Sequence, residues 1–333
     1  MAGTVARPKI YIDYISYFRA IGVLLRTGRG DYNIQENYDD VYAYNPSKTK
    51  SFTPIDNTFG IQFNLNIGTG TDEVSKLVSS MNFGAVLNHN IETLDYSSMK
   101  FDAINGASGT HYDLSNVTEF GDTKNNFRLF SWDSSEMKSY GISLSVDFNT
   151  SPDTNNPLKL GSIIAGRTFT FPHNANLSMN INNETNIRKT RTLGGADIVD
   201  INYYRQPLWN GYPPFVATND PSISATSSIG RRSWALTFSF LTQDSTFPQD
   251  MSEGFMFDNY MPTEGVNTWN NYTTENITSH FMTLTLNGQL PFLFQPDDTK
   301  DVYAWCRLKS NTFSVQQAAP NLYTSKMTFE EVW

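Results

Sequence analysis

Cysteine is nearly absent from this chain of 333 residues, which contains Cys306 alone. A single cysteine excludes an intrachain disulfide and any zinc site built from several cysteines. A chain of this size without disulfides is typical of a protein made in a reducing cytoplasm. Cys306 ends the apolar run Tyr303–Cys306, so we expect its thiol to be buried in a core.

Charged residues are also scarce, at 17%, and basic residues are the minority among them. The 24 Lys and Arg against 33 Asp and Glu give a formal net charge of −9 and a pI near 4.9. A general binder of nucleic acids or anionic membranes needs a basic surface, so we expect neither partner. No stretch approaches the ~18 apolar residues of a membrane span, and the first residues lack the apolar core of a signal peptide. We therefore expect no membrane insertion.

Motifs for catalysis or metal binding are missing as well. The histidines, none of which has HExxH or another metal-ligand spacing, are His89, His111, His173 and His280. We expect His89, at the end of an apolar run, to be a hydrogen-bonded structural histidine. The adjacent carboxylates Asp297–Asp298 follow Pro296 and are expected in a turn, and Glu330–Glu331 would point to opposite faces of a strand, so we expect neither to form a glycosidase pair. The sequence therefore predicts no enzyme, no catalytic residue, no cofactor and no metal site.

What the chain does have is an apolar period of two. Apolar and polar side chains alternate in five segments, 61–67, 142–148, 177–181, 234–240 and 282–286. Strands with one buried face give this pattern, and the 14% of aromatic residues fit a pleated surface. Helices are expected only at 72–81 and 250–260. The predicted fold class is all-β, with two β-sandwich or jelly-roll-like domains and few short helices.

An aromatic cluster is the first candidate for an interface or a glycan-stacking site. The segment Pro207–Phe215 contains Trp209 and Tyr212. Trp and Tyr rings can stack on sugars or anchor a protein interface, and core packing is the simplest alternative.

Two basic clusters are further candidates in this acidic chain. Arg231 and Arg232 precede Trp234, and Arg188–Arg191 precedes Gly194–Gly195. Nucleic-acid contact would use such groups. A solvated strand end or a salt-bridge site between subunits suits an acidic chain better.

The first half of the sequence resembles a domain of bacteriophage virion proteins. The segment Phe83–Ile91 (FGAVLNHNI) is similar to one in discoidin-like, galactose-binding-like jelly rolls. The strand Tyr140–Phe148 and the segment Leu160–Gly166 suit the same pattern. The resemblance implies a jelly-roll β-sandwich over residues 1–170, a fold that often binds carbohydrate or docks a partner.

The C-terminal end resembles the ends of phage tail-tip and baseplate proteins, including distal-tail-like ones. The motifs are Pro291–Asp297 (PFLFQPD), Tyr303–Arg307 (YAWCR), Ala318–Tyr323 (AAPNLY) and Phe329–Trp333 (FEEVW), with the preceding strand Arg232–Phe238. This resemblance implies a β-rich tail-assembly domain over residues 171–333.

Together the resemblances imply a structural component of a bacteriophage virion, a tail, baseplate or tail-tip ring protein that docks neighbouring tail proteins. The expected partners are other tail proteins and further copies of the chain in a ring. The alternative is a carbohydrate-binding virion module that contacts a glycan of the host surface. Either protein would be made in the host cytoplasm and end in the virion.

Overall fold

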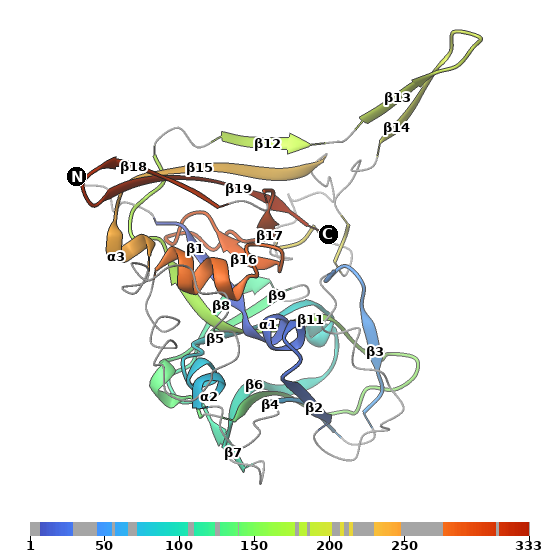
Figure 1. Cartoon of the computed structure of the whole chain (residues 1–333). Helices are drawn as coiled ribbons and strands as arrows, with labels where there is room; N and C mark the ends of the chain where they lie inside the picture. The colour runs from blue at the N-terminus through green and yellow to red at the C-terminus, as the bar shows by residue number, and fades with distance from the viewer. Residues whose placement is uncertain are drawn as a thin grey trace, which may run out of the picture.

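The computed structural model describes residues 7–28, 45–54, 57–65, 72–105, 110–123, 127–138, 140–176, 180–184, 187–201, 207–209, 213–215, 230–247, 276–310 and 313–332. These residues form mostly β-strands (Figure 1), which confirms the all-β class. The strands are β1 (Lys9–Asp13), β2 (Leu24–Gly28), β3 (Lys50–Phe52), β4 (Thr58–Leu65), β5 (Phe83–His89), β6 (Tyr96–Asn105), β7 (Thr110–Asp113), β8 (Thr118–Thr123), β9 (Phe127–Ser131), β10 (Gly141–Phe148), β11 (Leu158–Thr170), β12 (Asn180–Glu184), β13 (Ile187–Arg191), β14 (Asp197–Ile201), β15 (Arg231–Thr242), β16 (Phe292–Gln295), β17 (Ala304–Leu308), β18 (Ser314–Ala319) and β19 (Leu322–Glu331). The helices are short: α1 (Tyr14–Ala20), α2 (Asp72–Ser79), η2 (Ile91–Thr93), η3 (Ser134–Glu136), α3 (Gln243–Thr246) and η6 (Ile277–Met282).

The strands form three sheets. The largest has the order β12-β15-β19-β17-β16-β1-β11-β5-β9-β8, with β18 on β19 and β3 on β11. A second sheet has the order β2-β4-β10-β6-β7, and β13 and β14 form a separate two-stranded hairpin. The strand pairs are antiparallel.

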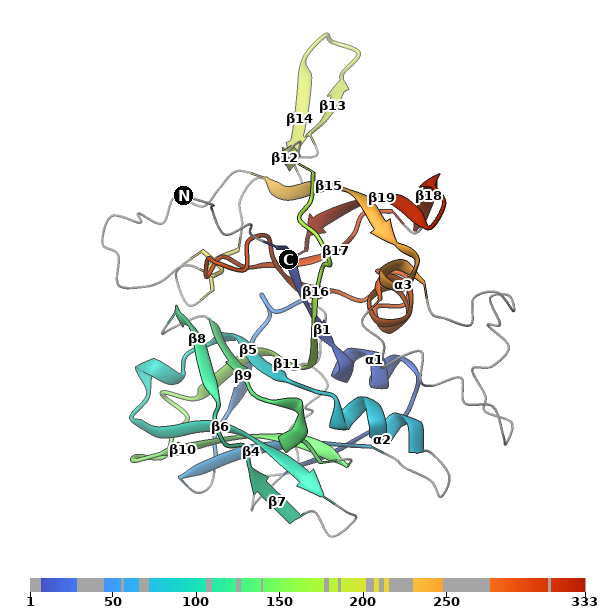
Figure 2. The same cartoon turned by 90° about the vertical axis from the view of Figure 1, so that its left-hand side faces the viewer.

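The first half of the chain is a β-sandwich. The β2-β4-β10-β6-β7 sheet lies against the β11-β5-β9-β8 end of the large sheet, in the lower part of Figures 1 and 2. Gly84 of β5 lies against the ring of Phe101 in β6, and a Cβ on Gly84 would come within 2.8 Å of that ring. The absent side chain therefore lets the sheets approach closely at this point. Phe101 also contacts Phe130 of β9, with 5.6 Å between ring centroids.

One strand joins this sandwich to the rest of the chain. In β1, Ile10 lies opposite Phe169 of β11 on one side and opposite Phe294 of β16 on the other. The large sheet therefore runs unbroken from the first half of the chain into the second (Figure 1). β11 ends at Thr170, but the division of the chain into 1–170 and 171–333 stays a prediction, because one core cluster includes residues of both halves.

A buried carboxylate fixes the end of β1. Asp13 caps α1 by accepting hydrogen bonds from the backbone N–H groups of Ile15 (3.1 Å) and Ser16 (3.2 Å). It also accepts from the Ser16 hydroxyl and, at 3.3 Å, from the N–H of Ala165 in β11. Burial raises the pKa of Asp13 from 3.8 to about 6, although these hydrogen bonds act in the opposite direction.

The middle of the large sheet is buried on both faces. In β1, Ile10 and Ile12 belong to one core cluster, whereas Tyr11 between them belongs to a second cluster. All seven residues of β5 are buried for the same reason. A strand covered on both sides reads as a continuous apolar run, which explains why Phe83–Leu87 shows no alternation.

Helix η6 helps to fill the first of these faces in the second half of the chain. Phe281 of η6 lies edge-on to Phe292 of β16 and Phe329 of β19, at centroid distances of 5.2 and 6.0 Å. Phe171, just after β11, stacks on Phe238 of β15 at 4.4 Å. These rings join the helix and the strands into one aromatic core.

Most of the predicted elements are confirmed. Segments 142–148 and 234–240 lie within β10 and β15, and residues 61–65 of the predicted segment 61–67 lie in β4, with 66 and 67 outside the described residues. The buried face expected for 234–240 ends at Phe238: Phe240 is 70% exposed at φ 62°, where the pairing with β19 shifts register, and Leu241 is buried instead. The helix predicted at 72–81 is α2. Of 177–181, the structure describes residues 180 and 181, which begin β12. The helix predicted at 250–260 lies outside the described residues.

The strand predicted at 282–286 is wrong. The segment continues η6, whose first turn is capped by Asn276 accepting from the N–H of Ser279 at 2.7 Å. The Thr285 hydroxyl donates to the carbonyl of Phe281 at 2.7 Å, which holds the last turn. All six residues of η6 are buried, so no exposed polar face reveals the helical period. In residues 282–286, Thr alternates with apolar residues, and this short alternation resembles the pattern of a strand by chance.

Two histidines are buried in the core. His89 of β5 and His280 of η6 are 1% and 0% exposed, and no described residue forms a hydrogen bond with their ring nitrogens. The expectation of a hydrogen-bonded His89 is therefore wrong. Burial, assisted by the charge of Arg128 near His89 and of Arg167 near His280, lowers each pKa from 6.5 to about 3. Both rings are neutral at pH 7.

Candidate functional site

The structure places Trp209, one of the two rings of the predicted aromatic site, inside the protein. Trp209 is 1% exposed and packs in the second core cluster, with 5.0 Å between its ring centroid and that of Phe215. Its indole N–H donates to the hydroxyl of Ser47 at 3.2 Å. A ring buried in this way has no face free for a sugar, so core packing is the alternative that the structure displays. Tyr212 lies outside the described residues.

Arg232 is held by a carboxylate of its own chain. Its guanidinium donates to Glu331 from Nε at 3.1 Å and from Nη2 at 2.6 Å, and it lies over the ring of Trp234 at 5.2 Å. Burial disfavours the charge on Arg232, but the hydrogen bond and charge of Glu331 outweigh it and raise the pKa of Arg232. Arg231, the first residue of β15, lies opposite Glu184 of β12. The predicted salt bridge is therefore internal to the chain.

Two further ion pairs join neighbouring strands close to the Arg232–Glu331 pair. Glu330 pairs with Arg307 of β17 at 3.1 Å, and Glu184 of β12 pairs with Lys309. Glu330 and Glu331 bind different arginines because adjacent residues of a strand point to opposite faces. The two carboxylates do not form an acid–base pair.

Removing the buried partner of Arg232 is expected to destabilise the protein. Glu331→Ala leaves a partly buried guanidinium without its carboxylate, and breaking a buried pair costs about 3 kcal/mol. The matched control is Glu330→Ala, which removes a partner of the half-exposed Arg307 and should cost less than about 1 kcal/mol. Urea unfolding measures both. Equal losses of unfolding free energy in the two variants would show that the buried pair stabilises the protein no more than the exposed one.

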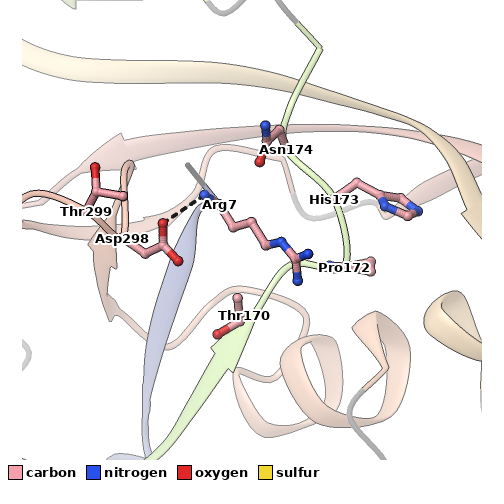
Figure 3. Close-up of a pocket in the computed structure, with 7 residues that line it drawn as sticks. All are labelled: Arg7, Thr170, Pro172, His173, Asn174, Asp298 and Thr299. Atoms are coloured by element: carbon pink, nitrogen blue, oxygen red, sulfur yellow. Dashed lines mark hydrogen bonds between the residues drawn. The ribbon is translucent and has the colours of Figure 1, made fainter. Parts of the chain in front are cut away.

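A cleft of about 610 Å³ opens beside the start of β1 (Figure 3). Its lining residues are Arg7, Thr170, Pro172, His173, Asn174, Asp298 and Thr299. Asp298 accepts a hydrogen bond from the backbone N–H of Arg7 at 3.0 Å, while the Arg7 guanidinium extends toward Pro172. The donors and acceptors of this lining could hold a small polar ligand.

The lining of the cleft does not supply a hydrolytic site. Glycoside hydrolysis needs two carboxyl groups, and among the described residues that line the cleft Asp298 is the one carboxylate. The neighbouring Asp297 is engaged in the turn, where it accepts from the N–H of Thr299 at 2.9 Å and from its hydroxyl at 2.5 Å. These hydrogen bonds lower the pKa of Asp297. Asp297–Asp298 is a turn, as predicted.

The hairpin of β13 and β14 projects from the body and is called the arm below (Figures 1 and 2). Its strands pair in register from Ile187 opposite Ile201 to Arg191 opposite Asp197. The turn between them contains Gly195 at φ 83°, in the left-handed region that glycine favours. Among the described strands, none pairs with either edge of the arm.

Apolar side chains on the arm are exposed to solvent. The exposed fractions are 50% for Ile187, 58% for Ile198 and 49% for Val199, and Leu193 at the turn is fully exposed. Single exposed apolar residues are ordinary, but several on one small hairpin mark a surface for interaction. A two-stranded hairpin that packs on nothing is also marginally stable alone. The arm is therefore the part of the described chain that a partner would cover.

Sequence reasoning found the basic cluster Arg188–Arg191 but not the arm that contains it. All five residues of β13 are exposed, so the cluster is a solvated strand, one of the expected alternatives. The missed signal is Gly194–Gly195 between two short segments with β-branched residues, a pattern typical of a hairpin.

Comparison with known proteins does not identify the chain: no family model matches it, and no curated protein is similar to it. None of the described helices is long and apolar enough to cross a membrane. In the same part of the chain, no group of three or more His, Cys, Asp or Glu side chains could hold a metal ion. The arm, the ion pairs and the cleft are the features from which a function can be inferred.

Proposed function

We propose that this chain is a structural component of a bacteriophage virion, in which several copies assemble into a tail, baseplate or tail-tip ring and dock neighbouring tail proteins. The arm carries this proposal. It presents exposed apolar residues and two unpaired strand edges, next to a body with a large internal core. An assembly protein needs such a surface, because neighbouring chains bury its apolar side chains and pair with its strand edges.

The C-terminal motifs support the tail assignment. They overlap β16, β17 and β19, which are consecutive neighbours in the large sheet, and also the end of β18 and the strand β15, which both pair with β19. Cys306 of β17 lies opposite Phe292 of β16 and opposite Glu331 of β19. Motifs that are separate in the sequence thus lie in neighbouring strands of one sheet, as is expected if they belong to a single tail domain. The choice of a phage tail rests on the resemblance of these motifs.

Replacing the arm should abolish assembly into particles without changing the stability of the folded body. Exchanging residues 188–200 for a short Gly-Asn-Gly linker removes side chains that are almost all exposed, so the unfolding free energy of the body should change by less than about 0.5 kcal/mol. Incorporation of the variant into particles should be lost. Mass spectrometry of purified virions and urea unfolding check the two results. Normal incorporation of the folded variant contradicts the assembly role of the arm.

The same mass spectrometry tests the proposal for the wild-type chain. We expect the protein in purified virions at several copies per particle. A folded chain that is abundant in infected cells and absent from virions would overturn the proposal.

Binding of a host glycan is a second candidate function, favoured by the cleft. The Arg7 guanidinium, the His173 imidazole and the Asn174 amide are suited to a polar or acidic sugar. No Phe, Tyr or Trp is among the described lining residues, so such a sugar would be held mainly by hydrogen bonds. Retention of glycans on an array by the wild-type protein, and its loss in Arg7→Ala, would support this function. An array without binding removes it.

A further inference from the structure

We propose that arms of successive copies pair head to tail, with the β13 edge of one arm against the β14 edge of the next. The pairing makes a continuous band of strands that holds the ring together. The inference rests on the proposed function, since it requires several copies in one assembly.

Both edges of the arm are available for such pairing. In a two-stranded sheet each strand uses one edge within the hairpin and leaves its other edge open, and no described strand covers either open edge. An open edge presents a row of backbone N–H and C=O groups that can pair with another strand. The arm also stands clear of the body in both views (Figures 1 and 2), so a second arm can approach it.

The charges on the two strands select the partner. β13 carries Arg188, Lys189 and Arg191, whereas β14 carries Asp197 and Asp200. Pairing β13 with β13, or β14 with β14, as in a two-fold dimer, would place like charges opposite each other. Pairing β13 with β14 of another copy places basic side chains beside acidic ones. The occupant that best complements the arm is therefore a second arm in head-to-tail order.

Strand direction agrees with this order. β13 and β14 are antiparallel within the arm. When copies related by rotation about one axis point their arms the same way, β14 of one copy is antiparallel to β13 of the next. Head-to-tail contacts of this kind close into rings when the rotation closes. The antiparallel geometry of the arm thus repeats across every subunit boundary.

The exposed apolar residues gain neighbours in the same arrangement. Ile187 and Val199 lie on one face of the arm, and Ile198 lies on the other. Each would lie beside side chains of the adjacent arm, on whichever face it occupies. Addition of strands on both sides also removes the isolation that makes a lone hairpin marginally stable.

Cross-linking between two variants of the full chain tests the pairing. Thr190→Cys marks β13 and Ile198→Cys marks β14, and the two positions lie opposite each other in the arm. Native Cys306 is buried and its pKa is raised by burial, so it gives little background. We expect oxidation to join the two variants through a disulfide when they are mixed, and neither variant to itself, because a disulfide needs Cα atoms within about 7 Å, whereas equal positions of successive arms lie two strands, or about 9.6 Å, apart. Links within each variant alone, or none in a mixture that forms rings, overturn the inference.

Charge exchange provides the independent test. Reversing β13 (Arg188→Glu, Lys189→Glu and Arg191→Glu) or β14 (Asp197→Lys and Asp200→Lys) should raise the concentration needed for self-association by roughly tenfold or more. Combining both sets in one chain restores opposite charges, within the arm and between arms, and should restore association. Analytical ultracentrifugation measures all three variants. Failure of the combined variant to recover overturns charge-directed pairing.

The outcomes for the arm and for the proposed function are distinguishable. If virions contain the chain in several copies but the arm variants neither cross-link nor change association, then head-to-tail pairing fails and the structural role stands. If the wild-type chain is absent from virions, the proposed function itself fails.

Discussion

Deletion of residues 326–333 is expected to unfold the second half of the protein. The deletion removes every β19 residue that pairs with β17, together with the buried side chains Met327 and Phe329. It also shortens the pairing of β19 with β15, which is the most extensive strand contact in this half. The loss of these two buried side chains, at about 2–5 kcal/mol each, together with the lost hydrogen bonds is of the same order as the roughly 5–15 kcal/mol that stabilises a typical domain.

Limited proteolysis and near-ultraviolet circular dichroism measure the effect of the deletion. We expect rapid cleavage within residues 230–325 and loss of the aromatic signal. A truncated chain that stays soluble, resists protease and enters virions would contradict the role assigned to β19.

Single substitutions in the same strand refine this test. Phe329 is fully buried, with 5.2 and 4.9 Å between its ring centroid and those of Phe292 and Phe294. Phe329→Ala should cost about 3–5 kcal/mol in urea unfolding. The control is Lys326→Ala, an exposed position of β19, which should change stability by less than about 0.5 kcal/mol.

Acid should destabilise the folded protein through His89 and His280. Each ring has a pKa near 6.5 when unfolded and about 3 when folded, because burial disfavours the charged form. Below pH 6.5 the unfolded chain binds more protons than the folded chain, so stability falls as pH falls toward 3. Each ring should remove about 3 kcal/mol between about pH 6.5 and pH 4. Together they rival the whole stability of a typical domain.

Asp13 acts in the opposite direction over part of this range. Its folded pKa of about 6 lies above the ordinary 3.8, so the folded state binds more protons there and stability rises as pH falls through 6 toward 3.8. One carboxylate offsets only part of the effect of two histidines. Net acid destabilisation is therefore the expected result.

Substitution isolates the contribution of one ring. His280 lies between the rings of Phe169 and Tyr14, at centroid distances of 5.8 and 6.3 Å, so His280→Phe fits an aromatic setting and cannot take up a proton. Its urea unfolding free energy should depend less steeply on pH between about 4 and 6.5 than that of the wild type. The exposed His173, changed to Phe, is the control and should leave the slope unchanged. Parallel profiles for wild type and His280→Phe would refute the role of this ring.

The strands that the sequence predicts well are those whose apolar side chains alternate with polar ones. In β15, buried and partly exposed side chains alternate from Trp234 to Ser239, and in β10 the apolar Ile142, Leu144 and Val146 alternate with Ser143 and Ser145, which are small and polar although they are buried as well. The strand β5 has no such period because both of its faces are covered, and only its β-branched and aromatic content suggests a strand. Helix η6 is missed for a related reason, since burial on every side removes the polar face that marks a helix.

The candidate site depends on contacts that no local pattern encodes. Trp209 is buried because Ser47, Phe215 and the central sheet cover it, and of these Ser47 and the sheet come from distant segments. The partner of Arg232 is Glu331, almost a hundred residues away. The basic residues of β13 were visible in the sequence. The sequence did not show that they lie on a hairpin that pairs with no other described strand. Residue types were predictable here, and their surroundings were not.

The central position of β1 has a consequence for the timing of folding. Lys9 pairs with Thr170 on one side and with Gln295 on the other. One edge of this N-terminal strand therefore stays unpaired until a segment near the end of the sequence has been synthesised. Contacts so distant along the chain form slowly and leave an open strand edge in the nascent protein. The final geometry of the body, and with it the direction in which the arm points, is reached only after residue 295 has left the ribosome. Incomplete chains therefore lack the continuous sheet that fixes the direction of the arm, so under the proposed function only finished chains would join a ring.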